Sequence, residues 1–398
     1  MAAIGPVPGK VANPAPLVHT PERERFPLRH ANEQHCRLLA NKPYPTHSSG
    51  MEQRTEFDPL RLLDALHAGA EHDCAFTATS AEAARAWQEH AAPVLARSLG
   101  FLDRPAPPVE AELEQTVDRG SYVRERVVLR TWPDATMPVW VLVPKGLDGP
   151  APCVLALHGH GYGVRDIVGL WEDGSERWQP DGYHKDFGCA LAERGFVVVA
   201  PEISCFGERR ADYSGLAGEF PGRAPDTCHN ATAYAIMLGG SAMGLRVWDG
   251  MRAIDYLATR PEADIARLGA MGISGGGAHA YFSTACDARI RACVISGYFC
   301  DWRHSILTFH HCTCNYVPGL MAHGELSDFA GLIAPRPCLI EAGRRDTDFP
   351  IAAVRAAVER AGAAWRAFGA GDALALDEFD GRHQISGRMA YDFLARHL

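Results

Sequence analysis

The chain has 398 residues, of which 47% are hydrophobic and 22% are charged, a composition typical of a globular protein with a large core. The formal net charge of -9 argues against a surface for nucleic acids or anionic membranes, so neither partner is expected. Residues 1–20 lack the cationic start and continuous apolar stretch of a signal peptide, and no apolar run is long enough to span a bilayer, which predicts a cytoplasmic protein.

The N-terminal third begins with residues 1–50, which are rich in proline and polar residues and show no periodicity, so we expect an irregular arm. Residues 51–118 are expected to form a helical extension. Asp58-Pro59 precedes a predicted helix over Leu60–His67, and Thr79 with Glu82 forms a capping box before a second predicted helix over Ala83–Leu99. Pro93 should kink or divide that second helix. The extension is expected to pack against a sheet, although it could instead cover an active-site mouth or form a homo-oligomer contact.

From residue 119 to residue 398 the pattern alternates between strands and helices. The predicted strands are Tyr122–Thr131, Met137–Pro144, Pro152–Leu157, Phe196–Pro201, Leu268–Gly272, Ile290–Ser296, Pro337–Ala342 and Ala373–Phe379, of which the first two read as an antiparallel pair. The predicted helices include Asp186–Arg194, Ser241–Ala258, Gly276–Thr284 and Ile351–Ala361. This alternation predicts an α/β catalytic domain with a mostly parallel, twisted sheet and helices on both faces.

The segment Gly272-Ile273-Ser274-Gly275-Gly276 fits the G-x-S-x-G pattern at the end of a predicted strand and just before a predicted helix. This context is typical of a nucleophile elbow, in which a strained turn presents a serine hydroxyl and the flanking glycines avoid clashes across the turn. Ser274 is therefore the candidate nucleophile. The pattern alone is weak in a chain with 39 glycines, so its predicted partners matter.

Two loops downstream of the elbow supply an acid and a histidine in the chain order of an α/β-hydrolase triad. Asp346 follows the predicted strand ending at residue 342 and is favoured as the acid over Asp348, which lies next to the start of a helix. Two histidines lie beyond Asp346, and His383 is favoured over His397 because it lies in a turn between a strand and the last predicted helix.

These motifs together resemble the dienelactone hydrolase and acetyl xylan esterase group of the α/β-hydrolase superfamily over roughly residues 120–398. The segments that carry the resemblance, besides the elbow, are His158-Gly159-His160-Gly161, the Pro201–Arg209 segment, Trp248-Asp249-Gly250, Tyr316–Leu320, Leu332–Pro337 and Asp346–Pro350. The resemblance implies a serine hydrolase of carboxylic esters in which Ser274, Asp346 and His383 are catalytic. By analogy with similar hydrolases, the backbone N–H groups of His160 and Gly275 form the oxyanion hole. No cofactor is required, and the expected partner is a neutral small-molecule ester.

Substrate specificity is expected in three long insertions, at residues 162–185, 203–240 and 298–328, because catalytic loops gather at the carboxyl edge of such a sheet. Aromatic side chains in these loops could stack on a sugar or an aromatic acyl group, or could simply pack a lid. The candidate substrate-binding residues are Trp171, Trp178, Tyr298 and Trp302.

The segment His310-His311-Cys312-Thr313-Cys314 contains two kinds of zinc ligand. Its C-x-C spacing lacks the usual two-residue separation, and no second pair of ligands lies nearby in the sequence. A metal-binding reading of the His/Gly loop at residues 158–163 also lacks a converging third ligand. We therefore expect no metal site, and the twelve cysteines are interpreted as reduced thiols because their spacing is not that of a disulfide framework.

Four functions remain open on the sequence. The first is a carboxylic-ester hydrolase, such as a deacetylase of a small glycoside or related metabolite. The second is a related serine hydrolase that cleaves a lactone, a peptide or a C–C bond, since a triad does not distinguish these bonds. The third is a catalytically silent binding protein on a hydrolase scaffold, and the fourth is a thiol-rich metal protein.

Overall fold

The computed structural model describes residues 58–219 and 226–398. The chain divides into two compact units, Met1–Leu62 and Leu63–Leu398. Of the first unit, only residues 58–62 are described, at the start of helix α2 (Pro59–Ala68), which agrees with the helix predicted after Asp58-Pro59. The predicted arm at residues 1–50 lies outside the described residues. None of the described helices combines the length and apolarity that a membrane span requires.

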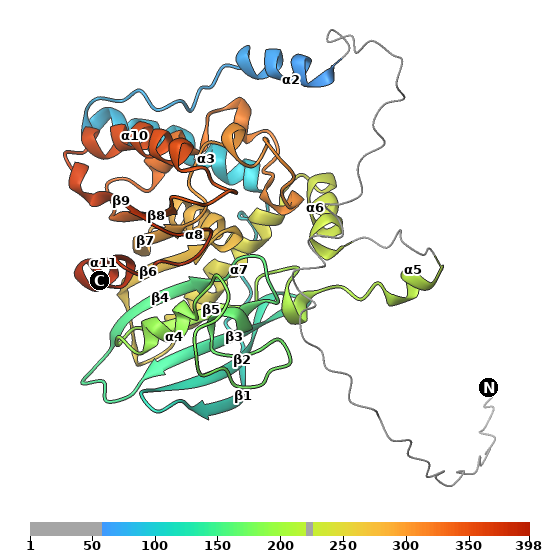
Figure 1. The fold of residues 1–398 in the computed structure, drawn as a ribbon, viewed down its shortest axis with the longest axis vertical. Coiled ribbons are helices and arrows are strands. Elements are labelled where there is room, and N and C mark those ends of the chain that lie inside the picture. Colours follow the sequence, from blue (N-terminus) through green and yellow to red (C-terminus); the bar gives the residue numbers. More distant parts are fainter. Residues whose placement is uncertain (1–57, 220–225) are drawn as a thin grey trace, which may run out of the picture. The chain divides into compact units, whose positions relative to one another are not determined.

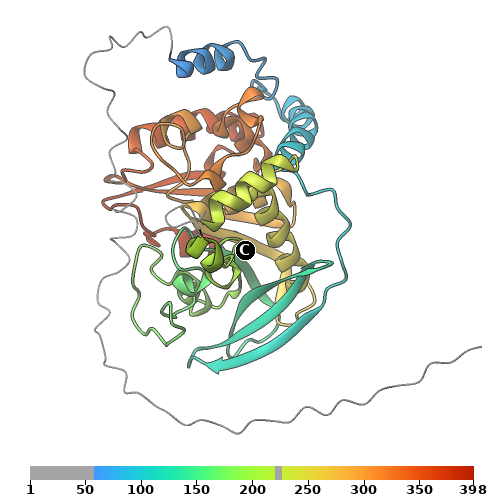
Figure 2. The ribbon, with the colours of Figure 1, turned by 90° about the vertical axis from the view of Figure 1, so that its right-hand side faces the viewer.

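A nine-stranded sheet forms the centre of the second unit, in the order β1-β2-β3-β5-β4-β6-β7-β8-β9 (Figure 1). Its strands are β1 (Ala111–Asp118), β2 (Tyr122–Trp132), β3 (Ala135–Pro144), β4 (Ala151–Leu157), β5 (Val197–Pro201), β6 (Ala263–Ile273), β7 (Ile290–Ser296), β8 (Cys338–Gly343) and β9 (Leu374–Phe379). Strands β4 to β9 run parallel to one another, whereas β1, β2 and β3 pair antiparallel and β3 meets β5 antiparallel. Figure 2 shows this antiparallel end as the teal strands at the lower part of the sheet. The predicted mostly parallel α/β sheet is confirmed.

Strand β1 was not predicted, and it lies inside the region expected to be helical. All but one of its residues are exposed, and it pairs on one side only, with β2, from Ala111 opposite Leu129 to Asp118 opposite Val123. An edge strand of this kind needs no alternation of apolar residues because neither of its faces is buried. The expectation of a helical extension up to residue 118 is therefore wrong in its last segment.

Helices cover both faces of the sheet, and each face has its own core. Along β4 the buried side chains alternate: Cys153, Leu155 and Leu157 belong to one core, and Val154 and Ala156 to the other. The first core is covered by α3 (Ala81–Leu99), α7 (Ala242–Leu257), α8 (Gly275–Cys286) and α10 (Ile351–Ala367), and the second by α4 (Phe187–Ala192) and α11 (Ala390–His397). Shorter helices outside the sheet are α5 (Ser214–Glu219), α6 (Thr227–Met237) and α9 (Leu326–Phe329).

Helix α3 differs from its prediction in two details. It is continuous through Pro93, which lies on the exposed side, so the Glu89 carbonyl that loses its usual donor remains open to water. Its N-cap is Ser80, whose hydroxyl accepts from the Ala83 N–H, and not Thr79. The helix packs against α7, α8 and α10, so it contacts helices that cover the sheet, whereas packing against the sheet was expected (Figure 1).

Candidate active site

Ser274 occupies the turn between β6 and α8 with φ 58° and ψ -125°, a backbone conformation that residues other than glycine rarely adopt. Its N–H donates to the Ser296 carbonyl at the end of β7. The flanking glycines are required by space: a Cβ on Gly272 would lie 2.1 Å from the Gly276 oxygen, and one on Gly276 would lie 2.0 Å from the Leu157 oxygen. The predicted elbow is therefore present, with the strain that such turns store.

Asp346 and His383 are joined by a hydrogen bond, with His383 Nδ1 2.7 Å from Asp346 Oδ2. The other carboxylate oxygen, Oδ1, accepts from the backbone N–H groups of Asp348, at 2.8 Å, and Phe349, at 3.1 Å. The Asp346 side chain is almost fully buried, whereas Asp348 is only partly buried. Asp348 thus contributes its backbone to the site, and the structure couples Asp346 to the histidine.

The position of the His383 ring is set by neighbours on three sides. A Cβ on Gly297, the residue after the Ser296 carbonyl that holds the elbow, would lie 3.0 Å from His383 Cε1. The Phe349 ring stacks on the imidazole at 5.8 Å between centroids and an interplanar angle of 17°, and the Tyr183 ring lies at 5.4 Å. The imidazole is therefore held beside the elbow. The alternative histidine, His397, lies on α11 against Phe393.

The predicted oxyanion loop passes directly over the elbow. A Cβ on Gly159 would lie 3.0 Å from the Ser274 Cβ and 2.3 Å from the Tyr183 hydroxyl, so only a glycine allows this approach. Within the described residues, neither the His160 N–H nor the Gly275 N–H meets an acceptor of the protein. Two free donors beside a serine hydroxyl suit an oxygen atom that gains negative charge.

Two buried histidines fix this loop, and the sequence did not single them out for that role. His158 Nδ1 lies 2.8 Å from the Gly159 oxygen, and its Nε2 accepts from the Ile203 N–H. His184 Nε2 accepts from the Gly159 N–H at 2.9 Å. Burial lowers the pKa of His184 well below its usual value, so the ring is neutral and its nitrogen is free to accept.

Buried carboxyl groups support the oxyanion loop and the loop that carries His383. Asp166 Oδ2 accepts from the Tyr162 N–H, and burial raises the pKa of Asp166 to about 6. Glu341, on β8, accepts from the N–H groups of Ser386 and Gly387 in the loop that carries His383, and burial raises its pKa to about 7. The sequence carried one sign of this role for Glu341, namely that it is the single acidic residue in an otherwise apolar strand.

The four predicted substrate-binding aromatics do not form one site. Trp171 and Trp178 are exposed, and each packs on an arginine, at 5.1 Å from Arg177 and 4.1 Å from Arg119 respectively. Tyr298 is buried, and its ring lies 5.3 Å from that of Phe349, the residue stacked on His383. Among the described contacts, none of the four touches a residue of the predicted triad.

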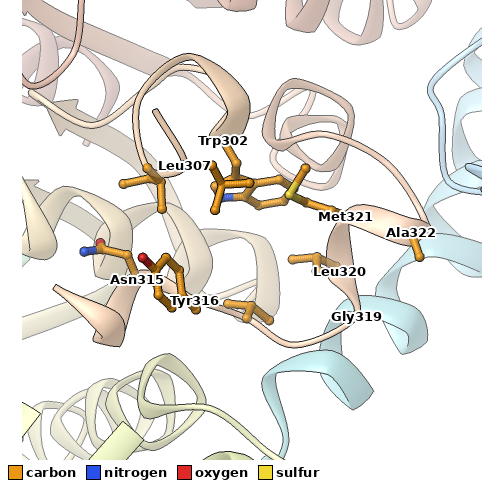
Figure 3. Close-up of a pocket in the computed structure, with 10 residues that line it drawn as sticks. Trp302, Leu307, Asn315, Tyr316, Gly319, Leu320, Met321 and Ala322 are labelled. Atoms are coloured by element: carbon orange, nitrogen blue, oxygen red, sulfur yellow. The ribbon is translucent and has the colours of Figure 1, made fainter. Parts of the chain in front are cut away.

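Trp302 lines an apolar cavity of about 220 Å³, toward whose centre the side chains in Figure 3 converge. The lining residues are Trp302, Ile306, Leu307, Asn315, Tyr316, Val317, Gly319, Leu320, Met321 and Ala322. A second cavity, of about 340 Å³, reaches the oxyanion loop at His160 and is otherwise formed by residues near 205, 226–229 and 310–313. The first cavity lies within the insertion at residues 298–328, and the second lies between this insertion and the one at residues 203–240.

Residues 61–367 match the Abhydrolase family, and the chain belongs to this family of the α/β-hydrolase superfamily. It is 31% identical over 260 residues to "Putative hydrolase YtaP" of Bacillus subtilis (strain 168), a match that covers 63% of this chain and 79% of that protein. A crystal structure of a putative acetyl xylan esterase from Bacteroides fragilis NCTC 9343 has a TM-score of 0.67 at 18% identity, over 82% of this chain and 84% of that one. A glucuronoyl esterase from Solibacter usitatus has a TM-score of 0.58 at 18% identity, over 83% and 99% of the two chains. These structures show that the fold is shared.

Proposed function

We propose that this protein is a serine hydrolase that cleaves a carboxylic ester through an acyl-enzyme on Ser274. The observation that carries the proposal is the hydrogen-bonded Asp346–His383 pair beside a strained serine turn, together with two backbone N–H groups near this turn, of His160 and Gly275, that have no acceptor in the described residues. Acyl transfer uses each of these features, and the stability of the fold does not require them to occur together.

In the proposed reaction the Ser274 Oγ attacks the ester carbonyl while His383 Nε2 takes its proton. Asp346 holds Nδ1–H and so keeps Nε2 free to act as the base. The N–H groups of His160 and Gly275 donate to the oxygen that becomes negative. The C–O bond then breaks, and His383 protonates the leaving alcohol. In the second half of the reaction, His383 takes a proton from a water molecule that attacks the acyl group, and it returns this proton to Ser274 Oγ as the acid is released.

The substrate we propose is a small ester, such as the acetyl ester of a glycoside. The support is the shared fold with structures named as carbohydrate esterases and the modest size of the cavities. Neither the lining residues nor the triad distinguishes an acetyl group from another short acyl group.

The test is labelling by a fluorophosphonate, combined with turnover of p-nitrophenyl acetate and of esters with longer acyl chains. The wild-type protein should be labelled on Ser274 and should hydrolyse the acetate faster than the long esters. Ser274→Ala should lose both properties. Ser283 is a buried serine on α8, the helix that follows the elbow, and Ser283→Ala should retain them. Labelling without any ester turnover would instead favour a lactone, peptide or C–C bond as substrate, and unlabelled Ser274 would refute the proposal.

A further inference from the structure

The oxyanion loop and two of the insertions bring one histidine and three cysteines together. His160 comes from the loop after β4, Cys228 from the first turn of α6, and Cys312 and Cys314 from the stretch around the short helix η5 (Thr313–Asn315). Their ligand atoms all lie within 4.8 Å of one another, and Cys314 Sγ is 3.4 Å from His160 Nε2. The sequence showed only the C-x-C pair, because the other two members lie far away along the chain.

The size and chemistry of this cluster match a tetrahedral zinc site. Zinc–sulfur bonds of about 2.3 Å and zinc–nitrogen bonds of about 2.0 Å place neighbouring tetrahedral ligands about 3.5 to 3.8 Å apart. The four atoms are therefore already close to the separation that one ion would impose. Three thiolates and one imidazole form a donor set of structural zinc sites.

A buried arginine supplies the charge that such a site requires. Arg246, on α7, is only 1% exposed, and its Nη2 lies 3.7 Å from Cys228 Sγ. Within the described residues it pairs with no carboxylate; its other neighbours are the Ser204 carbonyl and the Phe206 ring. A buried guanidinium is costly without an anion nearby. Zinc with three thiolates and a neutral imidazole carries one net negative charge, which one arginine balances.

Two further side chains near the cluster do not belong to it. A fifth thiol, Cys205, lines the same cavity but does not belong to the group of four. The neighbouring His311 is engaged elsewhere, with its Nε2 3.2 Å from the Ser305 hydroxyl.

We propose that His160, Cys228, Cys312 and Cys314 bind one zinc ion, which fixes the oxyanion loop to the two insertions that border it. Four protein ligands complete the coordination sphere, so the ion has no position for water or substrate and acts on structure. The His160 ring also lies against the elbow: a Cβ on Gly275 would be 2.9 Å from His160 Nδ1. A ligand bond at Nε2 would thus position both candidate oxyanion donors. This positioning role, unlike zinc binding itself, rests on the proposed function.

Zinc binding is tested on the full-length protein, first stripped by a chelator under reducing conditions and then titrated with Zn²⁺. Elemental analysis after dialysis should give one zinc per chain for the wild type. Cys314→Ser and Cys228→Ser should weaken binding by more than about 100-fold, since a bound ligand matters at least as much as its outer-shell partners. Cys205→Ser is the matched control and should bind like the wild type. Equal binding by Cys205→Ser and Cys314→Ser, or no retained zinc in the wild type, would overturn the proposal.

The absorption spectrum of the Co²⁺-substituted wild-type protein tests the site without any variant, so misfolding of a mutant cannot affect the result. A tetrahedral thiolate site should give intense visible d–d bands and a sulfur-to-cobalt charge-transfer band in the near ultraviolet. A weak octahedral spectrum would contradict the site, as would a Cys312–Cys314 disulfide in the freshly purified protein. Ser274→Ala should bind zinc normally, so the failure of the hydrolase proposal and the failure of the zinc site can be told apart.

The positioning role is tested by comparing zinc-free and zinc-loaded enzyme on the same ester. Zinc removal should lower kcat with little change in KM, in protein whose circular dichroism shows that the fold is retained, because oxyanion donors act on the transition state. Restoring Zn²⁺ should restore kcat. An unchanged kcat after zinc removal would refute the positioning role.

Discussion

Replacing Asp346 by asparagine tests the assignment of the catalytic acid, because the hydrogen bonds of Asp346 determine how the new amide group is oriented. Oδ1 of Asp346 accepts two backbone N–H groups, so the amide oxygen of the introduced asparagine should occupy that position. The NH₂ group must then face His383 Nδ1, which lies 2.7 Å from Oδ2 in the native protein. A donor there forces Nδ1 to become an acceptor and moves the ring proton to Nε2, where it prevents the ring from acting as a base.

The expected loss follows from this change of tautomer, which costs about 10⁴-fold in kcat in serine proteases. That factor corresponds to about 5.4 kcal/mol of transition-state stabilisation. The matched control is Asp348→Asn, which keeps the backbone N–H that Asp348 donates and should change kcat by only a few-fold. The assay is kcat for p-nitrophenyl acetate, with active sites counted by the fluorophosphonate. A loss below about tenfold for Asp346→Asn, or an equal loss for Asp348→Asn, would refute the reasoning.

Two further predictions concern the supports of the site. Gly159→Ala should leave the far-ultraviolet circular dichroism intact and lower kcat by at least about tenfold, because the new methyl group would meet the Tyr183 hydroxyl and the Ser274 Cβ; unchanged kcat would show that the loop is not packed as described. Glu341 has a pKa raised to about 7 by burial, so the folded protein binds a proton that the unfolded chain releases near pH 4.3. The contribution of Glu341 to stability therefore falls as the pH rises from about 4.3 to 7. Thermal unfolding at pH 5 and pH 8 should show a smaller difference for Glu341→Gln than for the wild type, and an equal difference would contradict the assignment.

The elements that the sequence predicted well are those with local signals. The parallel strands are continuous apolar runs, and the elbow, the HG loop and the turn around His383 each lie at the end of a predicted strand, where the topology of an α/β sheet gathers functional residues. The choice of Asp346 over Asp348 also used a local signal, the helix start at Pro350.

The residues that the sequence did not reveal depend on contacts between distant segments. His184 and Glu341 acquire their roles only when the sheet brings the loops that they support next to them. The cluster around Cys314 forms for the same reason, and no spacing rule covers ligands supplied by three segments that lie far apart in the sequence. Trp171 and Trp178 show the converse: their aromatic character was visible, but not their pairing with arginines.

The position of β9 at the edge of the sheet makes the loop with His383 sensitive to local unfolding. This strand is the outermost one at its end of the sheet, it pairs only with β8, and His383 lies in the loop that follows it. Edge elements open with less free energy than the sheet centre, so the histidine can detach while the core remains folded. Hydrolytic activity would therefore report local fraying of one sheet edge, and would be lost before spectroscopic probes of the core register unfolding. In a newly synthesised chain, likewise, His383 is not held next to Asp346 until β9 has paired with β8.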